Sequence, residues 1–366
     1  MATYGVSTYG VDIYGILMFV PAPQMPPPSV ADVTWGPGLA DVLISTIGGR
    51  NSIPIQAADL GVTWEVNRTS QMSADLPLST VLENWTDPRS LEGQWISWTG
   101  HPAGDWGGVI TSASPSRAQG VVTCACSDWS YYLAKRNLQK SVRTISGLPG
   151  GVAAALLTQA LAIDTLWLNS ITTYEEGDFT AVQINGQVLL DAMTRMAFDT
   201  DQEFDISASR DFTWARRLGR DRTNSVQLNE GMEIAESSPV FDIADIVNDL
   251  TISPAVSRYQ DSNARDVVDS ASVIAIGRQQ GQITTHDSVR PAAIRAIGAQ
   301  EVARSAKRGA TIALDVVDVN NCFAEFREGD TIRVVIASLG LAEDVRILQR
   351  GLVLSQSVLH VTGEIA

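Results

Sequence analysis

In two stretches of this chain, one near each end, the pattern of apolar and polar residues is typical of β-strands rather than of helices. One strand pattern occurs twice. Residues 92–98 read Glu-Gly-Gln-Trp-Ile-Ser-Trp, and residues 328–334 read Glu-Gly-Asp-Thr-Ile-Arg-Val. In both segments a Glu-Gly turn precedes a strand with isoleucine at the same register, which indicates that one β unit is present in two copies.

A second match lies downstream of each turn. Residues 108–114 read Gly-Val-Ile-Thr-Ser-Ala-Ser, and residues 351–357 read Gly-Leu-Val-Leu-Ser-Gln-Ser. The two matches are separated by nearly the same distance along the chain, so the copies would differ only by a short insertion between the strands. We therefore expect two related small β-barrel domains.

Turn residues divide both copies into short strands. In the first copy, strands are predicted at 40–47, 62–67, 94–99, 108–114 and 119–126. A short helix capped by Ser127 or Asp128 should follow and end near Arg136. In the second copy, strands are predicted at 246–252, 272–277, 311–317, 331–337, 345–348 and 351–363. A helix from Pro291 to about Arg308 interrupts them, since proline is favoured in the first turn of a helix.

Between the copies the period becomes helical. Two apolar stripes predict two helices, one carrying Val152, Leu156, Ala160 and Ile163, the other Leu189, Ala192, Met193, Met196 and Ala197. A hairpin should follow, with Phe204 and Ile206 before its turn and Phe212 and Trp214 after it. This segment is predicted to be a small α/β insert.

The predicted fold is thus mainly β with an α/β insert, in which two related β-barrel domains flank a helix-helix-hairpin domain. The expected boundaries are 1–37 for an extended N-terminal arm, 38–140 for the first barrel, 141–222 for the insert and 223–366 for the second barrel.

The arm has a composition of its own. Tyr4, Tyr9 and Tyr14 each precede a glycine at a spacing of five, and a proline-rich stretch at 21–28 holds the chain extended. A segment so rich in glycine and proline cannot build a core alone, yet its tyrosines have wide apolar faces. We expect the arm to lie along another subunit; the alternative is a disordered tail.

Composition narrows the range of functions. With 45% hydrophobic and 18% charged residues the chain should fold, and its net charge of −15 disfavours a protein that grips nucleic acid or an anionic membrane surface. No apolar run approaches the length of a membrane-spanning helix. No Lys or Arg precedes Arg50, and the apolar run at 16–20 is short, so we expect no secretion signal and no stable membrane binding.

Motifs for catalysis, cofactors or metals are not found. Of the three cysteines, Cys124 and Cys126 lie two apart in a strand and should be small buried thiols on one face. The acidic alternation Asp199–Asp205 imitates calcium-loop spacing, but Phe204 and Arg210 occupy positions that need glycine and glutamate. We interpret it as the solvated face of a strand, with a cation site as the alternative. His101 is the only histidine in a loop-like setting.

Tryptophans concentrate in one stretch. Five of the nine are Trp85, Trp95, Trp98, Trp106 and Trp129. Trp95 and Trp98 are three apart on a predicted strand and so point to opposite faces, one into the barrel core and the other, we expect, toward a neighbouring subunit. An aromatic cluster can also stack on sugars, so a carbohydrate-binding or carbohydrate-degrading protein is the alternative.

Together these motifs resemble the tail hub proteins of tailed bacteriophages, of the siphophage tail-tip or baseplate minor tail protein family. The resemblance rests on the strand after Glu92-Gly93, the strand 108–114, the ending Cys124-Ala125-Cys126-Ser127-Asp128-Trp129 that runs into a helix, and the second unit from Glu328. The segment Leu189-Leu190-Asp191-Ala192-Met193 resembles the domain between the two barrels, and the Tyr-Gly arm resembles the N-termini of some tail-tip proteins.

The resemblance implies a non-enzymatic structural protein of the virion tail tip, assembled in the bacterial cytoplasm. Such a hub is a homotrimer whose two barrels per chain form a pseudo-six-fold ring. It would bind a distal tail protein or tail tube protein on one side and a central fibre or spike on the other, with DNA passing transiently through its lumen. An acidic wall would repel DNA phosphates and so avoid retaining them. A receptor-binding fibre subunit is a further alternative, although the long repeats typical of fibres are not seen.

Overall fold

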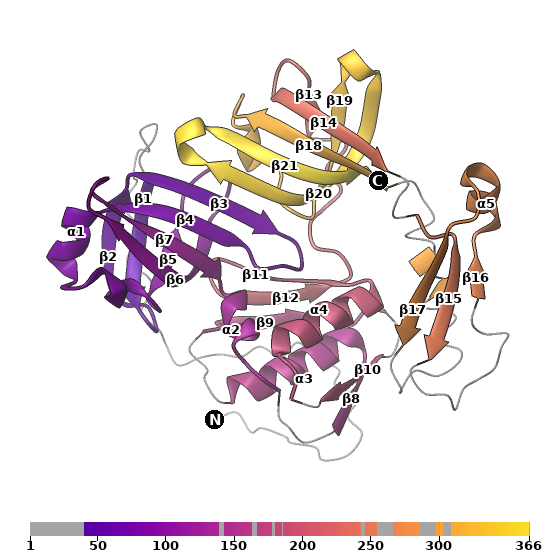
Figure 1. Cartoon of the computed structure of the whole chain (residues 1–366), viewed down its shortest axis with the longest axis horizontal. Helices are drawn as coiled ribbons and strands as arrows, with labels where there is room; N and C mark the ends of the chain where they lie inside the picture. The colour runs from indigo at the N-terminus through magenta and orange to yellow at the C-terminus, as the bar shows by residue number, and fades with distance from the viewer. Residues whose placement is uncertain are drawn as a thin grey trace. The chain divides into compact units, whose positions relative to one another are not determined.

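The computed structural model describes residues 40–365 apart from 139–142, 163–166, 178–179, 185, 243–245, 255–265, 286–297, 300 and 303–308. The chain forms two units (Figure 1). The first contains the described residues up to Leu218 together with Val353–Gln356, and the second contains Gly219–Leu352 and Ser357–Ala366. The predicted arm, including Tyr4, Tyr9 and Tyr14, lies outside the described residues. Among the described residues, no helix is both long enough and apolar enough to span a membrane.

The first unit is built on an antiparallel sheet. Its strands are β1 (Ala40–Thr46), β2 (Arg50–Ala57), β3 (Asp59–Glu65), β4 (Gln71–Pro77), β5 (Trp95–Trp98), β6 (Trp106–Ser116) and β7 (Val121–Asp128). Helix α1 (Leu78–Asn84) and a 3₁₀ turn (Pro88–Leu91) connect β4 to β5, and α2 (Ser130–Ala134) follows β7. Burial alternates along β4, where Met72, Ala74 and Leu76 point inward, because successive side chains of a strand face opposite sides.

The order of strands in this sheet is β3-β4-β7-β6-β5-β1-β2. No hydrogen-bonded ladder joins β2 to β3 in the described part of the unit, so the expected barrel is not closed by strand pairing. Instead the chain turns a corner between these strands, where the Ala58 N–H donates to the carbonyl of Asp75 on β4 at 2.7 Å. The fold is mainly β, as predicted, but this sheet is open.

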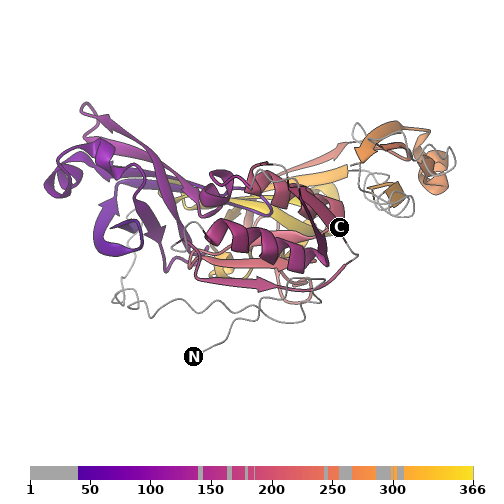
Figure 2. The ribbon, with the colours of Figure 1, turned by 90° about the horizontal axis from the view of Figure 1, so that it is seen from below.

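The predicted insert is present in the first unit. It contains β8 (Arg143–Gly147), α3 (Pro149–Leu161), β9 (Ser170–Thr173), β10 (Thr180–Ile184), α4 (Leu189–Thr200), β11 (Glu203–Ile206) and β12 (Asp211–Ala215). Strands β11 and β12 form the predicted hairpin, and β9 adds to it in parallel. Helices α3 and α4 lie side by side against this sheet (Figures 1 and 2).

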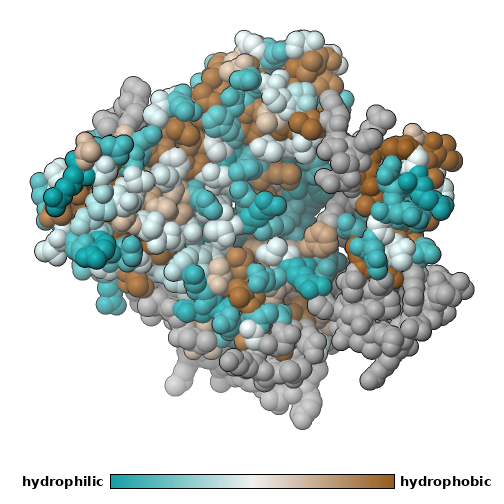
Figure 3. Space-filling model, viewed as in Figure 1, coloured by the Kyte–Doolittle hydropathy of each residue, from teal (hydrophilic) through white to brown (hydrophobic). Residues whose placement is uncertain are grey.

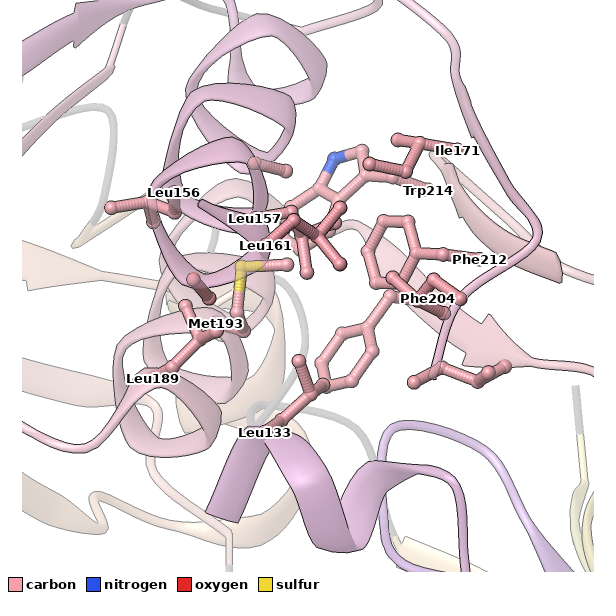
Figure 4. Packing of buried hydrophobic residues seen from close by; sticks show 14 of the residues in the cluster. Leu133, Leu156, Leu157, Leu161, Ile171, Leu189, Met193, Phe204, Phe212 and Trp214 are labelled. Carbon is pink, nitrogen blue, oxygen red and sulfur yellow. The ribbon is translucent and has the colours of Figure 1, made fainter. Parts of the chain in front are cut away.

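One hydrophobic core unites the insert with the first sheet. Leu156 and Leu157 of α3 and Met193 of α4 pack with Phe204, Phe212 and Trp214 of the hairpin, and Leu133 of α2 reaches the same cluster (Figure 4). Trp95, Val109 and Trp129 join it from the sheet side. The predicted stripes are correct for all their described members, which are buried, whereas Ile163 lies outside the described residues. The first β unit and the insert share their interior.

The second unit has its own sheet. It contains β13 (Gln227–Asn229), β14 (Ile234–Asp242), β18 (Gly309–Val317), β19 (Thr331–Ile336), β20 (Leu341–Val353) and β21 (Val358–Ile365), with a 3₁₀ turn at Cys322–Ala324. The order is β14-β18-β21-β20-β19-β13. The sheet is antiparallel apart from the parallel pairing of β13 with β19. The prediction for 345–363 is corrected at two points. Strand β20 continues without a break through 345–353, and the strand expected at 351–363 is interrupted by a 3₁₀ turn at Leu354–Gln356 before β21 begins.

Between β14 and β18 the chain forms a smaller layer with β15 (Asp249–Pro254), β16 (Asp266–Val268), β17 (Gln280–Thr285) and helix α5 (Ser270–Ile276), packed around Leu250, Ile252 and Val302. The strand predicted at 272–277 is thus wrong. Asp269 caps a helix there, accepting from the N–H groups of Ala271 and Ser272 at 3.0 Å each. Helix α5 leaves Ile274 87% exposed, and hydrophobic side chains gather at its surface (Figure 3). The helix predicted at 291–308 lies almost wholly outside the described residues.

Candidate functional site

The recurring Glu-Gly turn is the first candidate feature, and both copies have the same geometry. Gly93 has φ +82° and Gly329 has φ +88°, a left-handed conformation that favours glycine. The Gly93 N–H donates to the Ile110 carbonyl at 2.8 Å, and the Gly329 N–H donates to the Ile347 carbonyl at 2.7 Å.

Two further hydrogen bonds repeat around the turn. Ile110 N–H donates back to the carbonyl of Gln94 at 2.9 Å, and Ile347 N–H donates back to that of Asp330 at 2.8 Å. Ile110 of β6 is therefore the counterpart of Ile347 of β20. This corrects the register of the second sequence match, because Gly351 lies near the end of β20 while Gly108 lies near the start of β6.

The order of strands repeats as well. In each unit we start from the strand that follows the Glu-Gly turn, which is β5 in the first unit and β19 in the second. The order in the first sheet is then β5-β6-β7-β4-β3, and the equivalent order in the second is β19-β20-β21-β18-β14. The outer strands differ, since β1 pairs antiparallel with β5 whereas β13 pairs parallel with β19. The smaller layer with α5 stands where the first unit has only the short turn between β3 and β4.

An ion pair fixes the second copy of the turn. Arg350, 1% exposed, donates to Glu328 Oε2 through Nε at 3.0 Å and Nη2 at 2.7 Å, and its Nη1 donates to the Phe326 carbonyl at 3.0 Å. A buried guanidinium needs such partners, because an unpaired charge in the interior is costly. Glu328 therefore has a structural role that the sequence pattern alone did not show.

Trp95 and Trp98 lie on opposite faces, as predicted, but both are buried, at 4% and 0% exposure. The Trp95 indole donates to the Tyr132 hydroxyl at 2.7 Å and packs edge-on against Trp129. Trp98 packs with Trp64 and stacks on His101. Within one chain neither ring leaves a face for a neighbouring subunit, which corrects the expectation that one of them points outward.

The remaining members of the tryptophan stretch are also mostly internal. Trp106 and Trp129 are 2% and 3% exposed, and only Trp85 is half-buried. The Trp129 indole donates to the Ala208 carbonyl at 3.1 Å, and the Arg210 guanidinium lies 4.7 Å from the centre of the Trp95 ring. Burial lowers the pKa of Arg210. Trp95 and Trp129 thus hold the insert hairpin on the first sheet, and the four buried rings do not form a sugar-stacking platform.

The acidic alternation Asp199–Asp205 is not a strand face. Asp199 belongs to α4, and Asp201 ends that helix in a left-handed conformation, φ +51°. Glu203 is buried and accepts from the Leu218 N–H at 2.7 Å, whereas Asp205 is exposed. The period-two interpretation failed because α4 continues to Thr200. Among the described residues no group of acidic, histidine or cysteine side chains is arranged to hold a metal ion.

Asp128 is a buried titratable group that links two parts of the first unit. Its carboxylate accepts from the Ser70 N–H at 2.6 Å and the Ser130 N–H at 2.9 Å, and from the Ser130 hydroxyl. Burial raises the pKa of Asp128 to about 6, although these hydrogen bonds act in the opposite direction. The sequence had identified it only as a helix cap.

The three cysteines are buried and free, as expected of small interior residues. Cys124 and Cys126 share the inner face of β7. Burial raises the pKa of the Cys124 thiol to about 12 and that of Cys322 to about 11, and it raises that of Cys126 as well. Thiols in such surroundings are poor nucleophiles.

No protein-family model matches the sequence, and no curated protein matches it either. Solved structures do. The prophage MuSo2 43 kDa tail protein from Shewanella oneidensis aligns over 89% of this chain and 96% of its own, with a TM-score of 0.64 at 14% identity. The Neisseria meningitidis MC58 tail protein aligns over 89% and 96%, with a TM-score of 0.61 at 11% identity. Prophage tail protein gp18 from Listeria monocytogenes EGD-e aligns over 89% and 94%, with a TM-score of 0.60 at 13% identity. The chain therefore has the fold of prophage tail proteins.

Proposed function

We propose that this chain is a structural hub of a bacteriophage tail tip. Three chains would form a ring with six β units, and this ring would join the six-fold tail tube or distal tail protein to a three-fold tip, fibre or spike. DNA would pass through the ring without being held. The role is mechanical and needs no catalytic residue.

The observation that carries this proposal is the shared construction of the two β units. The same glycine turn with the same hydrogen bonds, and the same order of five strands, occur in each unit. We infer that they are two copies of one β domain, with 38–140 as the first and 223–366 as the second. A chain with two equivalent domains can present six equivalent positions from three copies, because closed rings place equivalent surfaces in equivalent environments.

The departures between the copies fit the same role. The insert with α3 and α4 follows the first copy only, and the layer with α5 interrupts the second copy only. Each would therefore occur three times in a trimer. Elements present three times can bind a three-fold partner, while the shared strands serve a six-fold partner.

The arm would complete the assembly. Tyr4, Tyr9 and Tyr14 are proposed to pack on a neighbouring subunit or tail protein, since a segment with so few charges and three tyrosines has apolar surface to bury. Trp95 and Trp98, which are buried, would contribute by stabilising the first unit of each chain. The carbohydrate-binding alternative is disfavoured, because four of the five tryptophans on which it rested are buried.

Copy number in purified virions tests the proposal. The amount of this chain, measured by quantitative mass spectrometry against a tail protein of known stoichiometry, should correspond to three copies per particle. A value of six would overturn the duplication argument. Absence of the chain from purified particles would overturn the structural role itself.

A further inference from the structure

Arginines are concentrated in one short segment of this acidic chain. Arg216, Arg217, Arg220 and Arg222 fall within seven residues, and Asp221 is the only acid among them. The chain as a whole has 26 Lys and Arg against 41 Asp and Glu. Such a local excess of positive charge differs from the rest of the sequence and marks the segment as a candidate for contact with an anionic partner.

Three of these arginines have no counter-ion within the described part of the chain. Arg216, Arg217 and Arg220 are exposed, and no acidic side chain of the described residues forms an ion pair with any of them. Asp221 is engaged elsewhere, since its carboxylate accepts from the Thr223 N–H at 3.0 Å and from the Thr223 hydroxyl at 2.7 Å. The three guanidinium groups are therefore available to another molecule.

Buried carboxylates hold the main chain on each side of these groups. In the first unit, Glu203 Oε2 accepts from the Leu218 N–H at 2.7 Å. In the second unit, Asp330 Oδ1 accepts from the Arg220 N–H at 2.7 Å, and Asp330 Oδ2 lies 3.0 Å from Arg222 Nε. Glu203 and Asp330 are 8% and 3% exposed. These contacts fix the main chain at Leu218 and at Arg220, each within its own unit, and leave the three guanidinium groups in solvent.

The three arginines are also close together along the chain. Consecutive Cα atoms are about 3.8 Å apart, so the Cα atoms of Arg217 and Arg220 lie within about 11 Å of each other. Like charges at such distances repel each other, although solvent weakens the repulsion. Within the described residues no contact of these guanidinium groups offsets it. This indicates that the compensating contacts are made with another molecule.

The chemistry of the segment favours a protein surface that carries carboxylates. Guanidinium is a planar group that donates two parallel hydrogen bonds to a carboxylate or phosphate, and arginine is enriched at protein interfaces. Double-stranded DNA fits less well, because proteins that grip nucleic acid need a broad basic surface and this chain has a net charge of −15. A second copy of this chain has carboxylates in excess and so has the required chemistry.

Ring geometry gives a further reason for a second copy. Identical chains of net charge −15 repel each other, and an interface in which opposite charges meet lowers this repulsion. In a closed ring of three chains each contact is head-to-tail and joins two different surfaces of the chain. One of these surfaces can therefore be basic and the other acidic, which a two-fold contact of one patch with itself does not allow.

We propose that Arg216, Arg217 and Arg220 dock onto exposed carboxylates of a second copy of this chain, its neighbour in the ring. The inference rests on the proposed three-chain hub and extends it by naming a surface through which the chains meet. Each chain gives its arginines to one neighbour and its carboxylates to the other, so the contact occurs three times in each ring.

Carbodiimide crosslinking in purified particles tests the contact by proximity. The reagent joins a lysine amine to a carboxylate that pairs with it and does not react with arginine. Arg216→Lys, Arg217→Lys and Arg220→Lys, made one at a time, keep the charge and should give particles at normal yield. Crosslinking should then produce dimers and trimers of the chain that the wild type does not give. The equally exposed controls Arg50→Lys and Arg117→Lys should not produce them.

Charge reversal tests the contact by assembly. Glutamate in place of all three arginines should lower incorporation of the chain into particles roughly tenfold or more, because the loss of central arginines weakens interfaces by such factors. Calorimetry of the purified chain should show unchanged unfolding. The matched control, Arg50→Glu with Arg68→Glu and Arg117→Glu, makes the same charge change at other exposed positions. Equal incorporation of the two variants would overturn the proposal.

Other outcomes separate this contact from the hub. Crosslinks from the new lysines to a different tail protein, or to no protein, in particles that hold three copies would overturn the contact and leave the hub intact. Retention of double-stranded DNA by the purified chain, lost on charge reversal, would assign the arginines to DNA and overturn the contact as well. Failure to find three copies would overturn the hub itself.

Discussion

At the residue scale, the role of Asp128 depends on its surroundings in the folded chain, which the sequence alone does not show. Asp128 looked like an ordinary helix cap. In the structure it is buried and receives three hydrogen bonds from two segments, at Ser70 and Ser130. Such a group couples the stability of the first unit to pH.

We predict that the contribution of Asp128 to the free energy of unfolding is lost as pH rises from about 4 to about 6. The pKa of Asp128 is about 6 in the folded chain against an ordinary value of 3.8, so in this range the folded state binds more protons than the unfolded state. Stability contributed by the protonated group is fully present below pH 4 and is gone above pH 6, a change of about 3 kcal/mol. The check is urea unfolding of the wild-type and Asp128→Asn chains at several pH values.

The difference between the two chains isolates the residue, because the other carboxylates titrate equally in both. The free energy of unfolding of wild type relative to Asp128→Asn should fall as pH rises and then level off. A difference that does not depend on pH would show that the carboxylate is not desolvated as the structure indicates.

Predictions for single residues were correct where the spacing along a strand alone decides which side chains share a face. Cys124 and Cys126 share a buried face, as their spacing in a strand required. Trp95 and Trp98 point to opposite faces, but the sequence could not show that both faces are covered, because the covering segments, α2 with the β11–β12 turn and the loop at His101, are distant or irregular. Whether the second face of β5 is buried depends on which segments pack against it, and the alternation of side chains along the strand does not show this.

At the element scale, the Glu-Gly turn is the part of the fold that sequence predicted best. Gly93 and Gly329 both have positive φ and both close onto the next strand. We predict that Gly93→Ala and Gly329→Ala each lower the free energy of unfolding by about 1–2 kcal/mol, because alanine is strained in a left-handed conformation. Nothing lies within 4 Å of a Cβ at Gly93, so strain and not a clash is the expected cause there.

Gly151→Ala is the matched control. Gly151 lies in α3 and its Cβ would meet only Glu175 at 3.8 Å, so alanine should leave stability unchanged or raise it slightly. Denaturant unfolding of the three variants gives the comparison. Equal effects at Gly93 and Gly151 would contradict the role of backbone conformation in the turn.

Helices and strands were mispredicted where the conformational preference of the residues differed from the structure that capping and neighbouring strands impose. Residues 272–277 are rich in valine and isoleucine, which favour strands, yet the Asp269 cap and the short reach to β17 form α5. Strand β2 was missed because Asn51 and Pro54 are typical of turns, and β4 because Ser73, Ala74 and Asp75 disfavour strands in isolation. Both are strands because neighbouring strands supply their hydrogen bonds.

At the scale of the whole molecule, the internal repeat could be detected from sequence but its register could not. Short matches at 92–98 and 328–334 were correct, whereas the match of 108–114 to 351–357 was displaced. Hydrogen bonds of Ile110 and Ile347 give the true equivalence.

The arm provides a prediction at this scale. Three tyrosines that each bury much of a ring could contribute roughly 1.5–3 kcal/mol apiece, against about 1–2 kcal/mol for each backbone residue that must be ordered. Docking is therefore favourable only on a partner that the extended chain fits closely. Deletion of residues 1–28 should leave thermal unfolding of the remaining chain nearly unchanged, while tails fail to assemble.

Tyr4→Ser, Tyr9→Ser and Tyr14→Ser together should reproduce the assembly defect in the full-length chain. Particle yield and calorimetry of the purified chain are the two measurements. Infectious particles at normal yield from the truncated chain would show that the arm has no role in docking.

The most direct test of the central claim is a cryo-electron microscopy map of the tail tip, refined without imposed symmetry above three-fold. We predict a ring of six β units around the channel, in which copies of the first and second units from three chains alternate. A ring with only one of the two β units of each chain, or with six chains, would contradict it.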